Sequence, residues 1–156
     1  MMYKNRSQGF TLIELLVVIA IIGVLSAVVL ASLNTARSKG NDAAVKANLS
    51  GARAEAEMYY DTNSDYTDVC LSSETNNILD NATAAKNALG TSVSVTRDAI
   101  GSATVVACND TATGWAIQSP LKGSDNTNYF FCVDSTGRAV PTVASVITTV
   151  GDVLCQ

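Results

Sequence analysis

The pattern of hydrophobic and polar residues divides the chain into unlike segments. A short segment ending at Gly9 is followed by an apolar run from Phe10 to about Asn34. No charged residue occurs from Leu15 to Leu33, and a helix of that length measures about 28 Å, close to the hydrocarbon thickness of a bilayer. The run contains no proline and one glycine, Gly23. The pattern therefore predicts one membrane-length helix over residues 10–34.

From residue 35 to about residue 60 the pattern becomes amphipathic. Apolar residues recur at spacings of three and four, which places them on one face of a helix; they are Val45, Leu49, Ala52, Ala56 and Tyr59. Gly40 is a position where the helix can bend or loosen, and Asn41 or Asp42 can cap a restarted helix. We expect two helical halves stacked end to end.

The remaining residues, 61–156, predict a β-rich body after one short helix. Ile78, Ala82, Ala85 and Leu89 mark that helix, and Gly90 stops it. Alternating or compact apolar runs then predict four strands, separated by Asn, Asp, Gly and Ser turns; they cover Ser92–Thr96, Ala103–Cys108, Trp115–Leu121 and Tyr129–Val133. We predict an α+β fold in which an antiparallel meander packs on the amphipathic half of the long helix.

Charge and length agree with a membrane-anchored chain carrying one external body. The 156 residues are 47% hydrophobic with a net charge of -4. Lys4 and Arg6 precede the apolar run, and most acidic residues follow Asn41, so the positive flank is expected inside and the body outside. Without the first nine residues the chain has eight basic and fourteen acidic residues, which argues against a broad nucleic-acid-binding surface but leaves a small basic patch open.

Four cysteines, all in the predicted body, point to an oxidising compartment. An even number without the close spacing of a zinc knuckle, in a chain that has no histidine, favours disulfides over a metal site. Four cysteines allow three pairings, and spacing alone leaves all three open. We expect no resident metal and no cofactor.

One ionisable residue lies near the start of the apolar run. Glu14 places a carboxylate in a membrane segment, where an unpaired charge costs several kcal/mol. Such a carboxylate needs a cation as its partner, in the same chain or in a neighbouring one.

A basic segment is followed by the stretch Gly9-Phe10-Thr11-Leu12-Ile13-Glu14 and by the apolar run to Gly23. Together they closely resemble the class III signal of type IV pilins and type II secretion pseudopilins. The resemblance covers about the first twenty-five residues and implies the pilin fold. It implies that residues 1–9 are a leader, that a prepilin peptidase cuts after Gly9 and methylates Phe10, and that Glu14 is needed for assembly. These chains often carry a proline near the end of the apolar segment, where this one has Val28–Ser32, so the helix is expected to be straighter.

The same resemblance implies a disulfide that closes a C-terminal loop. Cys132 with Cys155 fits that role, which leaves Cys70 with Cys108. The implied partners are other pilin subunits in a homopolymer, the prepilin peptidase, an inner-membrane assembly platform with its ATPase, and membrane lipid before assembly. The implied location is the cytoplasmic membrane as a single-pass precursor, and then an extracellular pilus or a periplasmic pseudopilus.

Other chemistry has weaker support. Asp98, Asp110 and the Asp134–Gly137 segment could be imagined as calcium ligands, but turn chemistry explains them better because they supply too few converging oxygens. Trp115 and the aromatic residues at 129–131 are expected in the core. Without histidine, a phosphate-binding glycine loop or clustered carboxylates, we expect no enzyme.

The sequence therefore predicts a structural subunit of a type IV pilus or related filament. The alternatives are a pseudopilin of a type II secretion system, a disulfide-bonded binding domain secreted after cleavage near residues 31–36, and a permanently anchored single-pass protein. An ordinary signal peptide has a shorter apolar core and does not need Glu14.

Overall fold

The computed structural model describes residues 9–71, 77–90, 92–123 and 130–156, and the chain divides into two units, Met1–Ala36 and Arg37–Gln156. Helix α1, Leu12–Asn63, begins in the first unit and ends in the second. It is helical through Gly40, so of the two alternatives at this glycine the helix that restarts at Asn41 or Asp42 is excluded. One glycine inside a helix costs only about 1 kcal/mol, and Asp42 caps no helix: its side chain accepts a hydrogen bond from the backbone N–H of Lys122 at 2.6 Å.

The α1 residues of the first unit present apolar side chains all round. The large ones from Leu12 to Leu33 are between 49% and 77% exposed. By length and composition this helix can cross a membrane, with a mean hydropathy of 3.0 over its most apolar window. Such a surface is stable only when lipid or other protein covers it.

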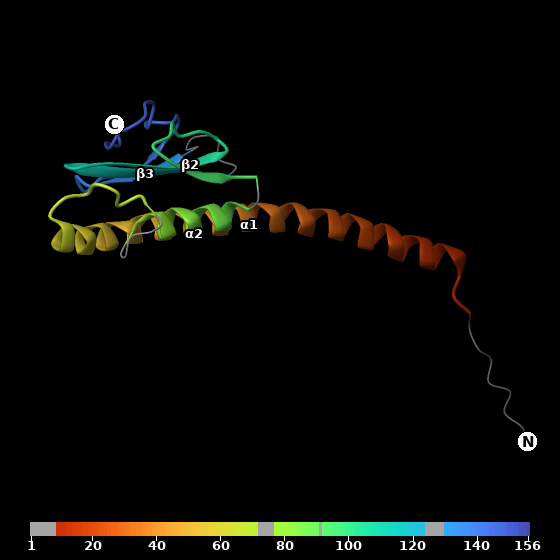
Figure 1. Cartoon of the computed structure of the whole chain (residues 1–156). Coiled ribbons are helices and arrows are strands. Elements are labelled where there is room, and N and C mark those ends of the chain that lie inside the picture. The colour runs from red at the N-terminus through yellow and green to blue at the C-terminus, as the bar shows by residue number, and fades with distance from the viewer. Residues whose placement is uncertain (1–8, 72–76, 91, 124–129) are drawn as a thin grey trace, which may run out of the picture. The chain divides into compact units, whose positions relative to one another are not determined.

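The second unit contains helix α2, Leu79–Leu89, and a five-stranded sheet in the order β1-β2-β3-β4-β5. Figure 1 shows the C-terminal half of α1 and helix α2 together on one face of this sheet. The strands are β1 Ser94–Arg97, β2 Val105–Thr111, β3 Gly114–Pro120, β4 Phe130–Asp134 and β5 Ala139–Thr142. The α+β fold class and α2, which ends before Gly90 at φ 96°, are as predicted.

The sheet differs from the predicted meander in one pairing and contains one additional strand. Strand β1 pairs with β2 in parallel rather than antiparallel, because loop 98–104 carries the chain back beside β1 before β2 begins. Strand β5 was not predicted, and it pairs antiparallel with β4 at the sheet edge. Pro141 has no backbone N–H to donate to the sheet, and proline is rare in strands. For this reason its sequence does not predict a strand, although an edge strand can accommodate it. Tyr129 of the predicted fourth strand and residues 124–126 of the predicted turn lie outside the described residues.

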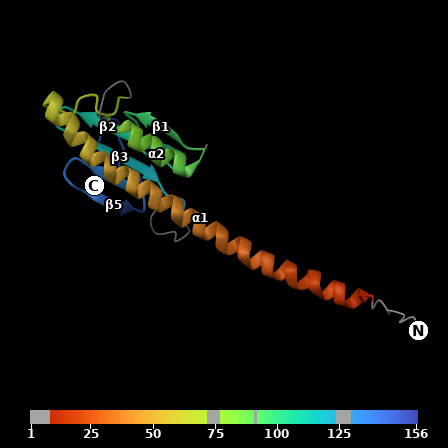
Figure 2. The same cartoon turned by 90° about the horizontal axis from the view of Figure 1, so that it is seen from below.

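The core between helices and sheet confirms the predicted apolar stripe. All five stripe residues of α1 are buried, from Val45 to Tyr59. Trp115 and Ile117 of β3 are fully buried in the same cluster, together with Ile78 and residues of α2. Figure 2 shows α1 and α2 side by side across these strands. Burying this apolar surface supplies the main stabilisation of the second unit.

The opposite sheet face carries a second core that the sequence pattern did not predict. There each central strand presents one small and one polar residue: Ala107 with Asn109, Ala116 with Gln118, and Cys132 with Asp134. The C-terminal segment, residues 143–156, covers this face, as Figure 1 shows. Ile147 and Cys155 of that segment are buried against the small residues.

Two disulfides stabilise the second unit. Cys70 is joined to Cys108, and Cys132 is joined to Cys155. These are the pairs that the resemblance implies. The first ties the segment after α1 to β2, and the second ties the end of the chain to β4. All four cysteines are buried.

Candidate functional site at the start of the long helix

The Gly9–Phe10 peptide bond lies in an exposed, non-helical segment. Residues 9–11 precede the first helical residue, Leu12. A Cβ placed on Gly9 would meet nothing within 4 Å, and the side chain of Phe10 is 90% exposed. Proteases cut most readily at exposed chain outside regular secondary structure. The described part of the predicted cleavage site is exposed and non-helical.

Thr11 and Glu14 form a capping box at the start of α1. The backbone N–H and the hydroxyl of Thr11 donate to Oε2 of Glu14 at 2.8 and 2.7 Å. In return, the backbone N–H of Glu14 donates to the Thr11 hydroxyl at 3.2 Å. This reciprocal pattern satisfies two amide groups that a helix start leaves without partners.

The capping box changes the sequence-based picture of Glu14. The charge of Glu14 alone predicts a cation as its partner, whereas the pattern Thr-x-x-Glu before an apolar run, not used above, predicts this cap. Both Thr11 donors reach Oε2, and no described residue donates to Oε1. The carboxylate therefore has one oxygen held by its own chain and one free to accept a hydrogen bond from elsewhere.

Comparison with known proteins decides what this segment is. A family profile described as the prokaryotic N-terminal methylation motif matches residues 4–30. The chain carries a prokaryotic N-terminal methylation motif. Within it, Gly9, Phe10, Thr11 and Glu14 lie together at the beginning of α1.

A curated relative supports the same conclusion. The chain is 49% identical over 63 residues to the type IV wide pilus major component PilA4 of Thermus thermophilus. The matched residues make up 40% of this chain and 48% of the relative. The chain thus spans about half the length of the curated relative that it matches. No solved structure matches the chain. The methylation motif and homology to a pilus component are therefore established for part of the chain.

The carboxylates considered for calcium meet an internal cation instead. Asp110, whose side chain is 1% exposed, lies 3.2 Å from Nε of Arg97. Asp98 and Asp68 also form ion pairs with Arg97, and Asp110 accepts a hydrogen bond from the backbone N–H of Asp68. The guanidinium occupies the centre of these carboxylates. Among the described residues, no group of three or more His, Cys, Asp or Glu side chains is arranged to hold a metal ion.

Asp134 serves the turn chemistry that the sequence predicts. Its Oδ1 accepts hydrogen bonds from the backbone N–H and hydroxyl of Thr136 and from the N–H of Arg138, while Oδ2 accepts one from Cys155 at 2.8 Å. Burial disfavours the charge, but these hydrogen bonds outweigh it and hold the pKa of Asp134 below its ordinary value. The carboxylate is thus fully engaged in the fold.

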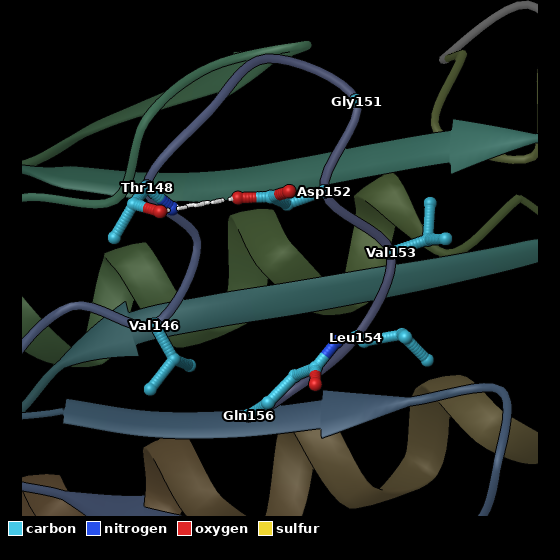
Figure 3. A pocket seen from close by; sticks show the side chains of 7 residues that line it. All are labelled: Val146, Thr148, Gly151, Asp152, Val153, Leu154 and Gln156. Atoms are coloured by element: carbon cyan, nitrogen blue, oxygen red, sulfur yellow. Dashed lines mark hydrogen bonds between the residues drawn. The ribbon is translucent and has the colours of Figure 1, made fainter.

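A shallow pocket of about 380 Å³ lies within the C-terminal segment. Figure 3 shows its seven lining residues, from Val146 to Gln156. Its one acidic side chain is Asp152, whose pKa is lowered by hydrogen bonds from the side chain and backbone of Thr149 and, to a smaller extent, from Thr148. The hydroxyl of Thr148 also donates to Oδ2 of Asp152, at 3.4 Å, so this carboxylate holds the C-terminal turn together.

Proposed function

We propose that this protein is a structural subunit of a type IV pilus, stored in the membrane and polymerised after removal of residues 1–9. The observation that carries the proposal is the methylation motif placed on an exposed, capped helix start. The apolar α1 surface beyond it has no protein covering in the single chain. The relative's description as a wide pilus major component favours a surface pilus over a secretion pseudopilus.

Cleavage after Gly9 would convert the capped helix start into an assembly site. The new α-amino group of Phe10 is a cation, and Oε1 of Glu14 is a free acceptor. In a bundle of parallel α1 helices, Glu14 of one subunit would accept a hydrogen bond from the Phe10 amine of its neighbour. Such a charge-assisted bond is strong where water is excluded, and a wrong register would leave both charges unmatched.

The proposed partners follow from this pathway. Before assembly, lipid covers residues 12–33 of α1, and the positive flank stays on the cytoplasmic side. A prepilin peptidase cuts and methylates at Phe10, and an assembly platform with its ATPase extracts the subunit. In the filament, α1 helices of sister subunits replace the lipid, while the second unit is displayed outside.

The decisive experiment measures the N-terminus and intact mass of the protein in the sheared-filament fraction of its own cells. The expected chain begins at N-methylated Phe10 and contains two disulfides. Glu14→Ala is expected to be cleaved normally yet absent from sheared filaments, whereas Gly9→Val is expected to remain uncut in the membrane.

Two results would contradict the proposal. A chain that starts near residue 36 would be a secreted domain, and an uncut chain in cells with active peptidase would be a permanent anchor. The Glu14 variant provides the matched control, because it separates failure of cleavage from failure of assembly.

A further inference from the structure

The second unit carries opposite charges at its two ends along α1. The end where α1 enters this unit is called the proximal end, and the end near Asn63 the distal end. The proximal end gathers basic side chains from α1, α2 and the segment after β3: Arg37, Lys39, Lys46, Lys86 and Lys122. Lys122 fixes these elements together, since its N–H donates to Asp42 and its Nζ to the carbonyl of Leu89.

The distal end is acidic. The last turns of α1 and the residues that follow carry Glu57, Asp61 and Asp65. Beside them Arg97 is the one described cation of its cluster, and it is outnumbered by Asp68, Asp98 and Asp110. The distal cluster therefore remains negative after its internal ion pairs are formed.

Several of these charges are available to another molecule. Arg37, Lys39 and Asp61 are exposed, and none of them forms a hydrogen bond or ion pair within the described part of the chain. Lys46 is exposed and lies 6.0 Å from the ring centre of Phe131. This contrasts with Arg97 and Asp110, which are already paired inside the fold.

We propose that the proximal basic end of one copy of this chain binds the distal acidic end of a neighbouring copy. The inference rests on the proposed function, in which all subunits leave one membrane in one orientation and stay parallel. Side by side at the same level, parallel copies would place like charges together. An axial shift instead places cations of one copy against carboxylates of the next, so the charges select a staggered register.

The spacing of the charges sets the size of this shift. At 1.5 Å per residue, Lys46 and Glu57 are about 17 Å apart along the helix, and Lys39 and Asp61 are about 33 Å apart. A neighbour displaced axially within this range brings the two ends together. Exposed pairs contribute little individually and are screened by salt, so the contact sets register and adds to the apolar association of the α1 helices.

A charge swap in the full-length chain tests the proposal. Lys39→Glu and Asp61→Lys are each expected to reduce the sheared filaments by about three- to tenfold, because each puts like charges in contact. The double variant restores opposite charges between positions 39 and 61 and is expected to recover most of the loss. Arg138→Glu, at the exposed β4–β5 turn, changes the net charge by the same amount as Lys39→Glu and should leave the filament amount unchanged.

The controls separate this inference from the proposed function. Cleavage at Phe10 and the membrane level of each variant are measured alongside, so a folding or processing defect is visible. If the unaltered chain forms no filaments, the proposed function fails. If filaments form but single reversals have no effect, or the double variant does not recover, the charge contact is wrong.

Cross-linking of unaltered filaments gives a second test that needs no variant. A carbodiimide joins lysine amines to carboxylates in direct contact. In filaments of mixed light and heavy isotope-labelled chains, we expect mixed-isotope peptides joining Lys39 or Lys46 to Glu57 or Asp61. Intact filaments in which the cross-links between copies avoid these two ends would overturn the proposal.

Discussion

Gln118 on β3 holds Ile147 of the C-terminal segment against the sheet. The side-chain Oε1 of Gln118 accepts hydrogen bonds from the backbone N–H groups of Val146 and Ile147, both at 2.9 Å. Its Nε2 donates to Ser145 Oγ at 2.9 Å. Gln118 is fully buried, so the groups near it need hydrogen-bond partners within the protein. Its side-chain amide supplies them to a segment that has no neighbouring strand to do so.

Replacing Gln118 with Met keeps most of the volume and removes the three hydrogen bonds. Two buried N–H groups would lose their acceptor, so we expect a loss of about 2–4 kcal/mol in the free energy of unfolding. Urea unfolding of the full chain in detergent measures it through the fluorescence of Trp115, the one tryptophan in the chain. Asn87→Met, an exposed change on α2, should alter stability by less than about 0.5 kcal/mol. Equal effects of the two changes would refute this role of Gln118.

Removing the Cys132–Cys155 disulfide should free the end of the chain. The bridge closes a loop with a sequence separation of 23, and the loop-entropy argument assigns such a closure about 3 kcal/mol. We expect Cys132→Ala with Cys155→Ala to destabilise the second unit and to open residues 143–156 to protease before the rest. Limited proteolysis followed by mass measurement identifies the first cuts. First cuts elsewhere would show that Asn109, Gln118 and Asp134 hold the segment unaided.

Thr11 is predicted to position Glu14 for assembly. Thr11→Val has nearly the same shape but removes the hydroxyl that donates to Glu14 at 2.7 Å and accepts from its N–H. We expect normal cleavage after Gly9 and a several-fold lower yield of sheared filaments. Thr11→Ser retains the hydroxyl and should restore most of the yield. If the Val and Ser variants assemble equally, the capping box has no part in assembly.

Asp134 predicts a pH dependence with a definite sign. Its pKa lies below the ordinary value in the folded chain, so its stabilising effect is complete above the unfolded pKa of about 3.9 and is lost as pH falls through the folded pKa. We expect Asp134→Asn to reduce stability at neutral pH, because its amide N–H would face the Cys155 N–H, and to weaken the loss of stability in acid.

The measurement for Asp134 is the free energy of unfolding in urea between pH 7 and pH 3. Asp61→Asn is the matched control, since it removes an exposed carboxylate that makes no hydrogen bond within the described residues. If Asp134→Asn loses as much free energy of unfolding between pH 7 and pH 3 as the unaltered chain, the pH dependence comes from other groups.

Local patterns were enough to predict much of this protein. The apolar run, the stripe from Val45 to Tyr59, and α2 with its Gly90 terminus depend on spacing within one helix, so the chain itself encodes them. The motif at Gly9, Phe10 and Glu14 is equally local. The capping box depends only on the three-residue spacing of Thr11 and Glu14, so it too can be predicted from the sequence. Neighbours along a helix are neighbours in sequence.

Only the tertiary structure decided what covers the far side of the sheet. Asn109, Gln118 and Asp134 look like turn or surface residues in sequence, yet they are buried and hold the irregular segment that follows β5. The parallel pairing of β1 and the guanidinium of Arg97 among three carboxylates are of the same kind. Their partners lie many residues away, and no local periodicity records which distant backbone groups a side chain will meet.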